Sequence, residues 1–236
     1  MAAYPTTLLA REDVARGTVA FHVAKPPGFR FNPGQAIDVI LPGAREELDL
    51  RHTFSIVSAP HEPRIEFATR MRDSEYKRAL GSLQAGSPLA IEGPFGSLTL
   101  PADRSRPVVL IAGGIGITPC ISMLRHATHE AASRAIMLFY SNRRIEDSAF
   151  LVELQGLERA LASFRLVATM TDADASAWKG PRGKIDAELL RSQTQAVQAP
   201  VYLVTGPPAM VEAMRTVLAS LGVAEESVRT EQFYGY

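Results

Sequence analysis

The spacing of hydrophobic and polar residues changes near the middle of the chain. Up to about residue 100, apolar residues come in short alternating runs separated by glycine, proline and other turn residues. Many short strands at such spacing are typical of a small antiparallel barrel or sandwich. The expected strands are 18–23, 35–41, 53–57, 64–69 and 88–92, with one helix expected at 74–80.

After residue 106 the strands become longer and alternate with helices. Residues 107–112 form a continuous apolar run that ends in glycines, as in a strand buried on both faces. The expected elements that follow are helix 119–129, strand 135–140, helix 147–162, strand 164–170, helix 185–191, strand 201–204 and helix 209–221. This alternation predicts a doubly wound parallel sheet. We therefore predict two domains, residues 1–101 and 102–236, divided at a polar segment with a proline at each end.

A glycine-rich turn joins the first strand of the second domain to its helix. Gly113, Gly114 and Gly116 allow the backbone to turn sharply and to approach a ligand closely. Thr118 is a good helix N-cap and Pro119 suits the first helical position. The free N–H groups of such a helix start attract an anion, most plausibly a diphosphate. Many strand-to-helix turns carry glycine for geometry alone, so both interpretations stand at this point.

The turn after the next strand is polar and dibasic. In dinucleotide-binding folds an acidic residue near this place receives the ribose hydroxyls of NAD, whereas arginine accommodates the 2′-phosphate of NADP. Here Ser141, Arg143 and Arg144 offer a hydroxyl and two guanidinium groups to a phosphate. The alternative interpretation is an ordinary solvated basic turn. We expect NADPH, with NADH also possible.

Composition excludes several classes of function. The 236 residues carry 25 basic and 25 acidic side chains, so no basic excess points to nucleic acid. No apolar stretch is long enough to cross a bilayer, and no secretory signal is visible, so a cytoplasmic protein is expected. The single cysteine, Cys120, excludes an internal disulfide and an Fe–S cluster held by four thiolates. The five histidines show no ligand spacing, so we expect them to be solvated and expect no metal site.

Five segments resemble, in order, the motifs of the ferredoxin–NADP reductase superfamily of flavoproteins. They are His-Thr-Phe-Ser at 52–55, Glu-Gly-Pro-Phe-Gly at 92–96, Gly-Gly-Ile-Gly-Ile-Thr-Pro at 113–119, Thr-Gly-Pro-Pro at 205–208 and Glu-Gln-Phe at 231–233. The resemblance spans essentially the whole chain. It implies an antiparallel FAD-binding β-barrel followed by an NAD(P)-binding α/β domain.

The resemblance also implies a set of site residues. For FAD they are Arg51, His52, Thr53, Phe54, Ser55, Thr69, Met71, Ser74, Lys77 and Tyr236. For the pyridine nucleotide they are Gly113, Gly114, Gly116, Thr118, Pro119, Ser141, Arg143, Arg144, Gly206 and Pro207. For catalysis they are Ser55 near the flavin N5, Thr205 and Glu231 beside the nicotinamide, and Phe233 stacked on the flavin.

This chain departs from the family motifs at several positions. His52 stands where the family has arginine, and Arg51 precedes it; strand alternation points the two to opposite faces. Phe54 replaces a tyrosine, and Thr205 replaces a cysteine. The chain continues past Phe233, so which aromatic ring covers the flavin stays open.

We therefore expect an FAD-dependent NAD(P)H oxidoreductase. It would pass hydride from NADPH to flavin and then electrons to a separate carrier, such as ferredoxin or flavodoxin, or to a small-molecule acceptor. An acidic carrier would dock on clustered barrel residues: Arg64, Arg70, Arg72, Lys77 and Arg78. The alternatives are a flavin or ferric reductase, and an electron-transfer subunit of a larger complex.

Overall fold

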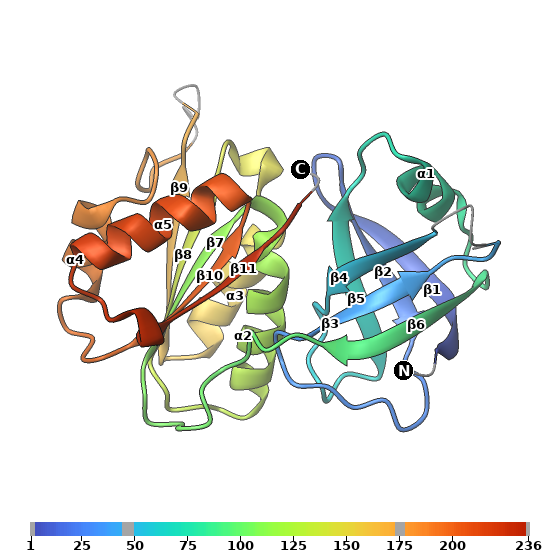
Figure 1. The fold of residues 1–236 in the computed structure, drawn as a ribbon, viewed down its shortest axis with the longest axis horizontal. Coiled ribbons are helices and arrows are strands. Elements are labelled where there is room, and N and C mark those ends of the chain that lie inside the picture. The colour runs from blue at the N-terminus through green and yellow to red at the C-terminus, as the bar shows by residue number, and fades with distance from the viewer. Residues whose placement is uncertain (1–2, 44–49, 173–177, 235–236) are drawn as a thin grey trace. The chain divides into compact units, whose positions relative to one another are not determined.

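A computed structural model describes residues 3–43, 50–172 and 178–234 of the chain (Figure 1). It divides into two compact units. The first unit comprises Met1–Thr99 and Thr118–His126, and the second comprises Leu100–Ile117 and Ala127–Tyr236. The helix segment that follows the glycine-rich turn therefore belongs with the first sheet, although its sequence continues from the second. The domain boundary at residue 101 stays a prediction.

The first unit contains a six-stranded antiparallel sheet. Its strands are β1 (Tyr4–Ala15), β2 (Thr18–Ala24), β3 (Ala36–Ile40), β4 (Arg51–Ser55), β5 (Arg64–Arg70) and β6 (Pro88–Phe95), in the order β4-β3-β6-β1-β2-β5. A bridge between Ile56 and Phe67 joins the end of β4 to β5, the opposite edge strand. The sheet therefore curls toward closure, and the prediction of an antiparallel barrel is confirmed.

Aromatic rings fill much of the barrel interior. Phe67 stacks on Phe21 and on Phe54, with ring centroids 5.3 and 5.0 Å apart. Helix α1 (Glu75–Ser82) packs Tyr76 and Leu80 into the same core. Its N-cap is Ser74, whose hydroxyl accepts a hydrogen bond from the N–H of Lys77 at 3.2 Å. The sequence thus folds here as predicted, with a serine cap before an amphipathic helix.

The second unit contains a five-stranded parallel sheet. Its strands are β7 (Val108–Gly113), β8 (Ile136–Asn142), β9 (Phe164–Met170), β10 (Val201–Gly206) and β11 (Val228–Gln232), in the order β11-β10-β7-β8-β9. Figure 1 shows α4 (Ala187–Thr194) and α5 (Pro208–Ser220) on one face of the sheet and α3 (Leu151–Ala160) on the other. The doubly wound parallel sheet is confirmed.

The structure differs from the sequence-based expectations in three places. Strands β1 and β11 were not expected, because both are largely polar and partly exposed along their length. The helix expected at 147–162 is interrupted: a 3-10 helix (Ile145–Asp147) is separated from α3 by Phe150, whose φ is +61°. Tyr140 Oη donates a hydrogen bond to the Ala149 carbonyl at 3.1 Å, which holds this break in place.

Candidate active site

Two turns meet at the carboxyl end of the parallel sheet. The strand order reverses between β7 and β10, because β8 and β9 lie on one side of β7 and β10 and β11 lie on the other. This is the topological switch point, where open α/β sheets bind ligands. The glycine-rich turn follows β7 and the turn at Thr205–Pro207 follows β10, so both predicted nucleotide segments lie at this point.

Close backbone packing explains the glycines of these turns. A Cβ on Gly116 would lie 2.7 Å from the carbonyl oxygen of Thr205 and 2.8 Å from the backbone of Gly206. A Cβ on Gly113 would lie 2.1 Å from the sulfur of Met210. Gly206 has a φ of +150°, a conformation that favours glycine. The two turns touch through bare backbone, which brings their N–H groups to one place.

The rest of the glycine-rich turn is helical. Gly114–Ile117 form a 3-10 helix that continues directly into α2 (Thr118–His129). The helix therefore begins at Thr118, one residue earlier than predicted, with Pro119 in its first turn. Thr118 is 4% exposed. The turn is thus an extended helix start, with the geometry that binds anions.

Thr205 joins the two turns directly. Its side chain is fully buried, and its hydroxyl donates a hydrogen bond to the Gly116 carbonyl at 2.6 Å. A threonine in place of the family's cysteine therefore acts here as a positioning residue that fixes one turn on the other. The catalytic role of Thr205 stays a prediction.

The dibasic turn after β8 is only partly available to a phosphate. Arg144 Nε lies 2.5 Å from Asp172 Oδ2, and this contact raises the pKa of the Arg144 guanidinium. Arg143 is exposed, and its carbonyl accepts a hydrogen bond from the Asp172 N–H at 3.0 Å. Ser141 is partly buried on the same turn. Sequence reasoning missed Asp172, because 28 residues separate it from Arg144 and its position depends on the neighbouring strand β9.

The C-terminal strand places two predicted catalytic residues beside β10. Glu231 pairs in register with Thr205, and the Phe233 N–H donates to the Gly206 carbonyl at 3.0 Å. Burial raises the pKa of the Glu231 carboxyl. This carboxyl therefore holds its proton to higher pH than an exposed glutamate does. Tyr236 lies outside the described residues.

On the barrel, the alternation of β4 separates Arg51 from His52. Arg51 lies 2.6 Å from Glu92 Oε2 and 3.3 Å from Asp38 Oδ2, and its hydrogen bond to Glu92 lowers the pKa of that carboxyl. Thr53, on the same face, donates to Asp38 Oδ1 at 2.5 Å. His52 points the other way, with its ring centroid 4.8 Å from that of Phe54. The structure thus puts His52, and not Arg51, on the face that carries the motif's aromatic residue.

Lys77 lies on this same aromatic face. Its ammonium is 4.6 Å from the ring centroid of Phe54 and 5.9 Å from that of Tyr76, and it donates a hydrogen bond to the Thr69 hydroxyl. Burial lowers the pKa of Lys77 to about 8. In the described part of the chain no carboxylate forms an ion pair with it. Met71, which follows β5, packs against the barrel core.

Ser55 ends β4 as an unpartnered polar group. The residue is 4% exposed, and its hydroxyl has no hydrogen-bond partner among the described residues. Buried hydroxyl groups are nearly always hydrogen-bonded in native proteins. We call four of the predicted flavin residues, His52, Phe54, Ser55 and Lys77, the barrel site; strand alternation puts Ser55 on the opposite face of β4 from His52 and Phe54.

Comparisons with known proteins agree with this architecture. Residues 110–216 match the family model described as the oxidoreductase NAD-binding domain. The chain is 30% identical to the reductase component of propane 2-monooxygenase from Mycolicibacterium goodii, over 97% of this chain and 67% of that protein. It is also 30% identical to ferredoxin–NADP reductase B from Sorangium cellulosum, over 91% of this chain and 90% of that protein.

A solved structure shows the same fold. The chain superimposes with a TM-score of 0.82 and 20% identity on a ferredoxin NADP+ reductase from Neisseria gonorrhoeae with bound FAD and NADP, covering 98% of this chain and 99% of that one. The parallel sheet with its paired turns and the family match define an NAD(P)H oxidoreductase. More particularly, the chain belongs to the ferredoxin–NADP reductase-like family. The predicted family resemblance is confirmed.

Proposed function

We propose that the protein is an FAD-dependent NADPH oxidoreductase that passes electrons to a separate acceptor protein. The observation that carries this proposal is the junction of the two turns at the switch point of the sheet, in a chain whose relatives are reductases. A glycine-lined junction of backbone N–H groups accepts a dinucleotide diphosphate. The described helices include none that is long and apolar enough to cross a membrane.

The barrel site fits FAD. Lys77 supplies a buried cation with no carboxylate partner among the described residues, and it suits the diphosphate of the cofactor. Ser55 supplies a buried hydroxyl that lacks a partner, and it suits a ring atom of the flavin. Phe54 is 7% exposed and already contacts Phe67 and Lys77, so this ring supports the site more than it offers a free face.

When bound, the flavin supplies hydride acceptance and stepwise electron release. The chain's own residues would position the flavin and the nucleotide and supply hydrogen bonds and a proton. Ser55 would donate a hydrogen bond that orients the flavin ring system. Glu231, which keeps its proton to higher pH because it is buried, would hold or donate that proton at the nicotinamide edge. Phe233 would cover the flavin, and Thr205 keeps the two turns in register.

Arg143 and Ser141 are the residues of the nucleotide site that would distinguish NADPH from NADH. Arg143 is exposed at the carboxyl end of β8, where a guanidinium meets a 2′-phosphate in dinucleotide-binding folds. Arg144 contributes less, because its guanidinium already contacts Asp172. This arrangement favours NADPH, while NADH remains usable through the rest of the site.

The proposed acceptor is a separate protein, such as a ferredoxin or flavodoxin, or the oxygenase component of a monooxygenase. The relatives include both a ferredoxin–NADP reductase and a reductase component of a monooxygenase, which supports acceptor transfer over a self-contained reaction. Of the basic residues expected to dock an acidic carrier, Lys77 is buried and Arg78 pairs with Asp73. Arg64, Arg70 and Arg72 remain as the candidate docking residues.

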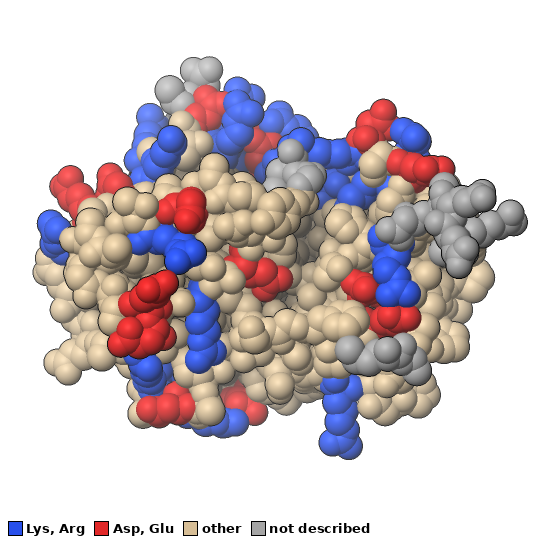
Figure 2. All heavy atoms as spheres, viewed as in Figure 1, with Lys and Arg blue, Asp and Glu red and all other residues tan. Residues whose placement is uncertain are grey.

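The face of the molecule shown in Figure 2 carries charges of both signs. On the face shown in Figure 2, basic and acidic side chains are interspersed over wide uncharged areas. This agrees with equal numbers of basic and acidic residues in the chain.

We propose a cytoplasmic location, where reduced pyridine nucleotide is available to the site.

Anaerobic mixing of the flavin-loaded protein with NADPH tests the function. We expect the visible absorbance of the flavin to bleach within the mixing experiment, and to return when an oxidised ferredoxin or flavodoxin is added. The matched control is Arg143→Ala, which should slow bleaching by NADPH but not by NADH. A flavin that neither nucleotide bleaches would contradict the proposal.

A further inference from the structure

One polar cluster of the barrel has no part in the proposed reaction. Glu12, His22 and Glu66 lie on the neighbouring strands β1, β2 and β5. His22 is the direct cross-strand partner of Glu66, and Glu12 lies two residues beyond Ala10, the partner of His22 on β1. Because every second residue of a strand points to the same face, the three side chains share one face of the sheet.

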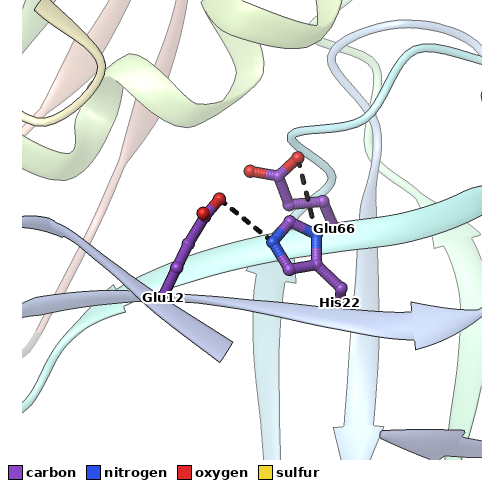
Figure 3. A group of neighbouring side chains, drawn as sticks. All are labelled: Glu12, His22 and Glu66. Atoms are coloured by element: carbon purple, nitrogen blue, oxygen red, sulfur yellow. Dashed lines mark hydrogen bonds and ion pairs between the residues drawn. The ribbon is translucent and has the colours of Figure 1, made fainter. Parts of the chain in front are cut away.

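The imidazole of His22 lies between the two carboxylates, as Figure 3 shows. Its Nε2 is 3.1 Å from Glu12 Oε1, and its Nδ1 is 3.9 Å from Glu66 Oε2. One nitrogen or oxygen from each of the three residues falls within 4.8 Å of the other two. The cluster thus gathers one imidazole and two carboxylates in a single small volume.

Two of the three residues are buried with unpartnered atoms. The side chain of His22 is 4% exposed and that of Glu66 is 1% exposed. His22 Nδ1 and Glu66 Oε1 are buried, and neither has a hydrogen-bond partner among the described residues. A buried carboxylate oxygen without a donor is costly, so its presence points to a ligand that the oxygen can bind. The expectation that the histidines are solvated is therefore wrong for His22.

The carboxylates in and around the cluster outnumber the lysine and arginine side chains that lie near them. Arg125, from α2, lies 2.6 Å from Glu66 Oε2 and 3.5 Å from Glu62 Oε1. Lys25 donates hydrogen bonds to the carbonyls of Pro60 and Glu62, and its ammonium interacts with the charge of Glu62. These two cations offset Glu66 and Glu62. The only ion-pair partner of Glu12 among the described residues is His22.

We propose that Glu12, His22 and Glu66 form a binding site for a divalent transition-metal ion of the zinc type. The ion would bind one ring nitrogen of His22 and one carboxylate oxygen each from Glu12 and Glu66, with water in the open position. Glu66 Oε2 would keep its contact with Arg125, in the way that ligating carboxylates are commonly held by an outer partner.

The size of the cluster suits such an ion. Ligand bonds to zinc are about 2.0–2.2 Å long, so two ligand atoms on one ion lie no more than about 4.3 Å apart. The three ligand atoms lie within 4.8 Å of one another, so the excess over this limit is at most about half an ångström. Glu12, whose side chain is 61% exposed, is free to close that difference from the solvent side. Imidazole with carboxylates suits zinc and its neighbours in the first transition row better than calcium or magnesium.

Calorimetric titration of the flavin-loaded protein with Zn²⁺, after removal of metals by a chelator, tests the proposal. We expect one ion per chain with a Kd in the micromolar range or tighter, and a higher melting temperature in the presence of Zn²⁺. Glu12→Gln removes one ligand from an exposed side chain, so the fold should survive and affinity should fall by about 10- to 100-fold. Asp13→Asn is the matched control, because the neighbouring carboxylate points to the opposite face of β1 and should leave binding unchanged.

A second variant guards against binding elsewhere. His22→Gln should abolish the same binding event, and its melting temperature without Zn²⁺ reports whether the barrel still folds. If the unmodified protein takes up no Zn²⁺, or if Glu12→Gln binds it as tightly as the unmodified protein, the site does not exist. Flavin reduction by NADPH is independent of this titration, so failure of one proposal leaves the other standing.

Discussion

The candidate functional residues fall into two halves, one in each unit, and the halves are built from different chemical groups. At the switch point of the parallel sheet the close contacts are between backbone atoms, and Gly116 and Gly206 keep the turns close enough to touch. In the barrel site the working groups are side chains: among the described residues the buried Ser55 hydroxyl has no hydrogen-bond partner, and the Lys77 ammonium, which donates to Thr69, has no carboxylate partner. The nucleotide half is thus complete in itself, whereas the flavin half is complete only around its cofactor.

Because of this difference, the two halves should respond differently to amino-acid substitution. A backbone site tolerates no added atoms, because its neighbours are main chain and cannot move aside. A side-chain site tolerates substitution of its members but loses cofactor affinity one interaction at a time.

The largest effect is expected from Gly116→Ala. The added methyl would lie 2.7 Å from the Thr205 carbonyl oxygen, well inside contact distance. Overpacking of this kind lowers the free energy of unfolding by about 1–3 kcal/mol. A displacement of the bound nucleotide by about 1 Å lowers the rate of its reaction roughly a hundredfold. We expect a lower melting temperature and loss of NADPH binding, measured by thermal denaturation and by nucleotide titration.

Gly156→Ala is the matched control. Its Cβ would meet nothing closer than a guanidinium nitrogen of Arg159 at 3.9 Å, in the middle of α3, where Gly156 is only partly buried. Alanine there should stabilise the protein slightly and leave nucleotide binding intact. Equal behaviour of the two variants would show that the turns do not need their close approach.

The next effect is expected in the barrel from Lys77→Met. This change keeps the buried stem but removes the cation that we propose binds the FAD diphosphate. A hydrogen bond to a charged group is worth about 1.5–3 kcal/mol, so FAD affinity should fall by about 10- to 150-fold. Arg78→Met, on the exposed side of the same helix, should leave FAD affinity unchanged; fluorescence titration with FAD measures both.

The same lysine should make FAD binding depend on pH. Because its pKa is about 8 before the cofactor binds, Lys77 loses its charge as pH rises through that value. FAD affinity should therefore weaken between about pH 7 and about pH 9.5 in the unmodified protein, and should change much less in Lys77→Met. An affinity that rises with pH would remove Lys77 from the cofactor site.

A smaller effect, with an unusual sign, is expected from Ser55→Ala. Removing a buried hydroxyl without a partner should raise the melting temperature of the flavin-free protein. In the loaded protein the same change should slow flavin reduction by about fivefold, the value of one neutral hydrogen bond. Stopped-flow absorbance and thermal denaturation measure the two effects. An unchanged reduction rate would leave Ser55 without a role in hydride transfer.

The smallest effect separates the two arginines of the nucleotide turn. Arg143→Ala should raise KM for NADPH by about fivefold and leave KM for NADH unchanged, because only NADPH carries the 2′-phosphate. Arg144→Ala should change the preference less, since its guanidinium contacts Asp172 at 2.5 Å. A larger shift from Arg144 than from Arg143 would reverse the assignment. Steady-state kinetics with both nucleotides decides it.

Sequence alone was enough for the backbone half of the site. A buried apolar run followed by glycines and Thr118-Pro119 predicts the turn, and the structure places it at the switch point as expected. Strands β1 and β11 escaped prediction because cross-strand pairing, and not a hydrophobic pattern, holds them. Local sequence carries no signal for such pairing.

The side-chain half could be predicted only in outline. Strand alternation was enough to separate Arg51 from His52, but not to show that Arg51 pairs with Glu92, which is 41 residues away. The burial of Lys77 against Phe54 depends on the packing of α1 over the barrel. The cluster of Glu12, His22 and Glu66 likewise arises from three strands, so spacing along the chain could not reveal it.

Equilibrium titration of the flavin-free protein with FAD tests most directly whether the barrel site is incomplete without its cofactor. Binding of one FAD per chain, with a rise in melting temperature and with reduction of the bound flavin by NADPH, is the predicted result. A protein that is isolated colourless, quenches no flavin fluorescence on titration and melts at the same temperature with and without FAD would contradict it.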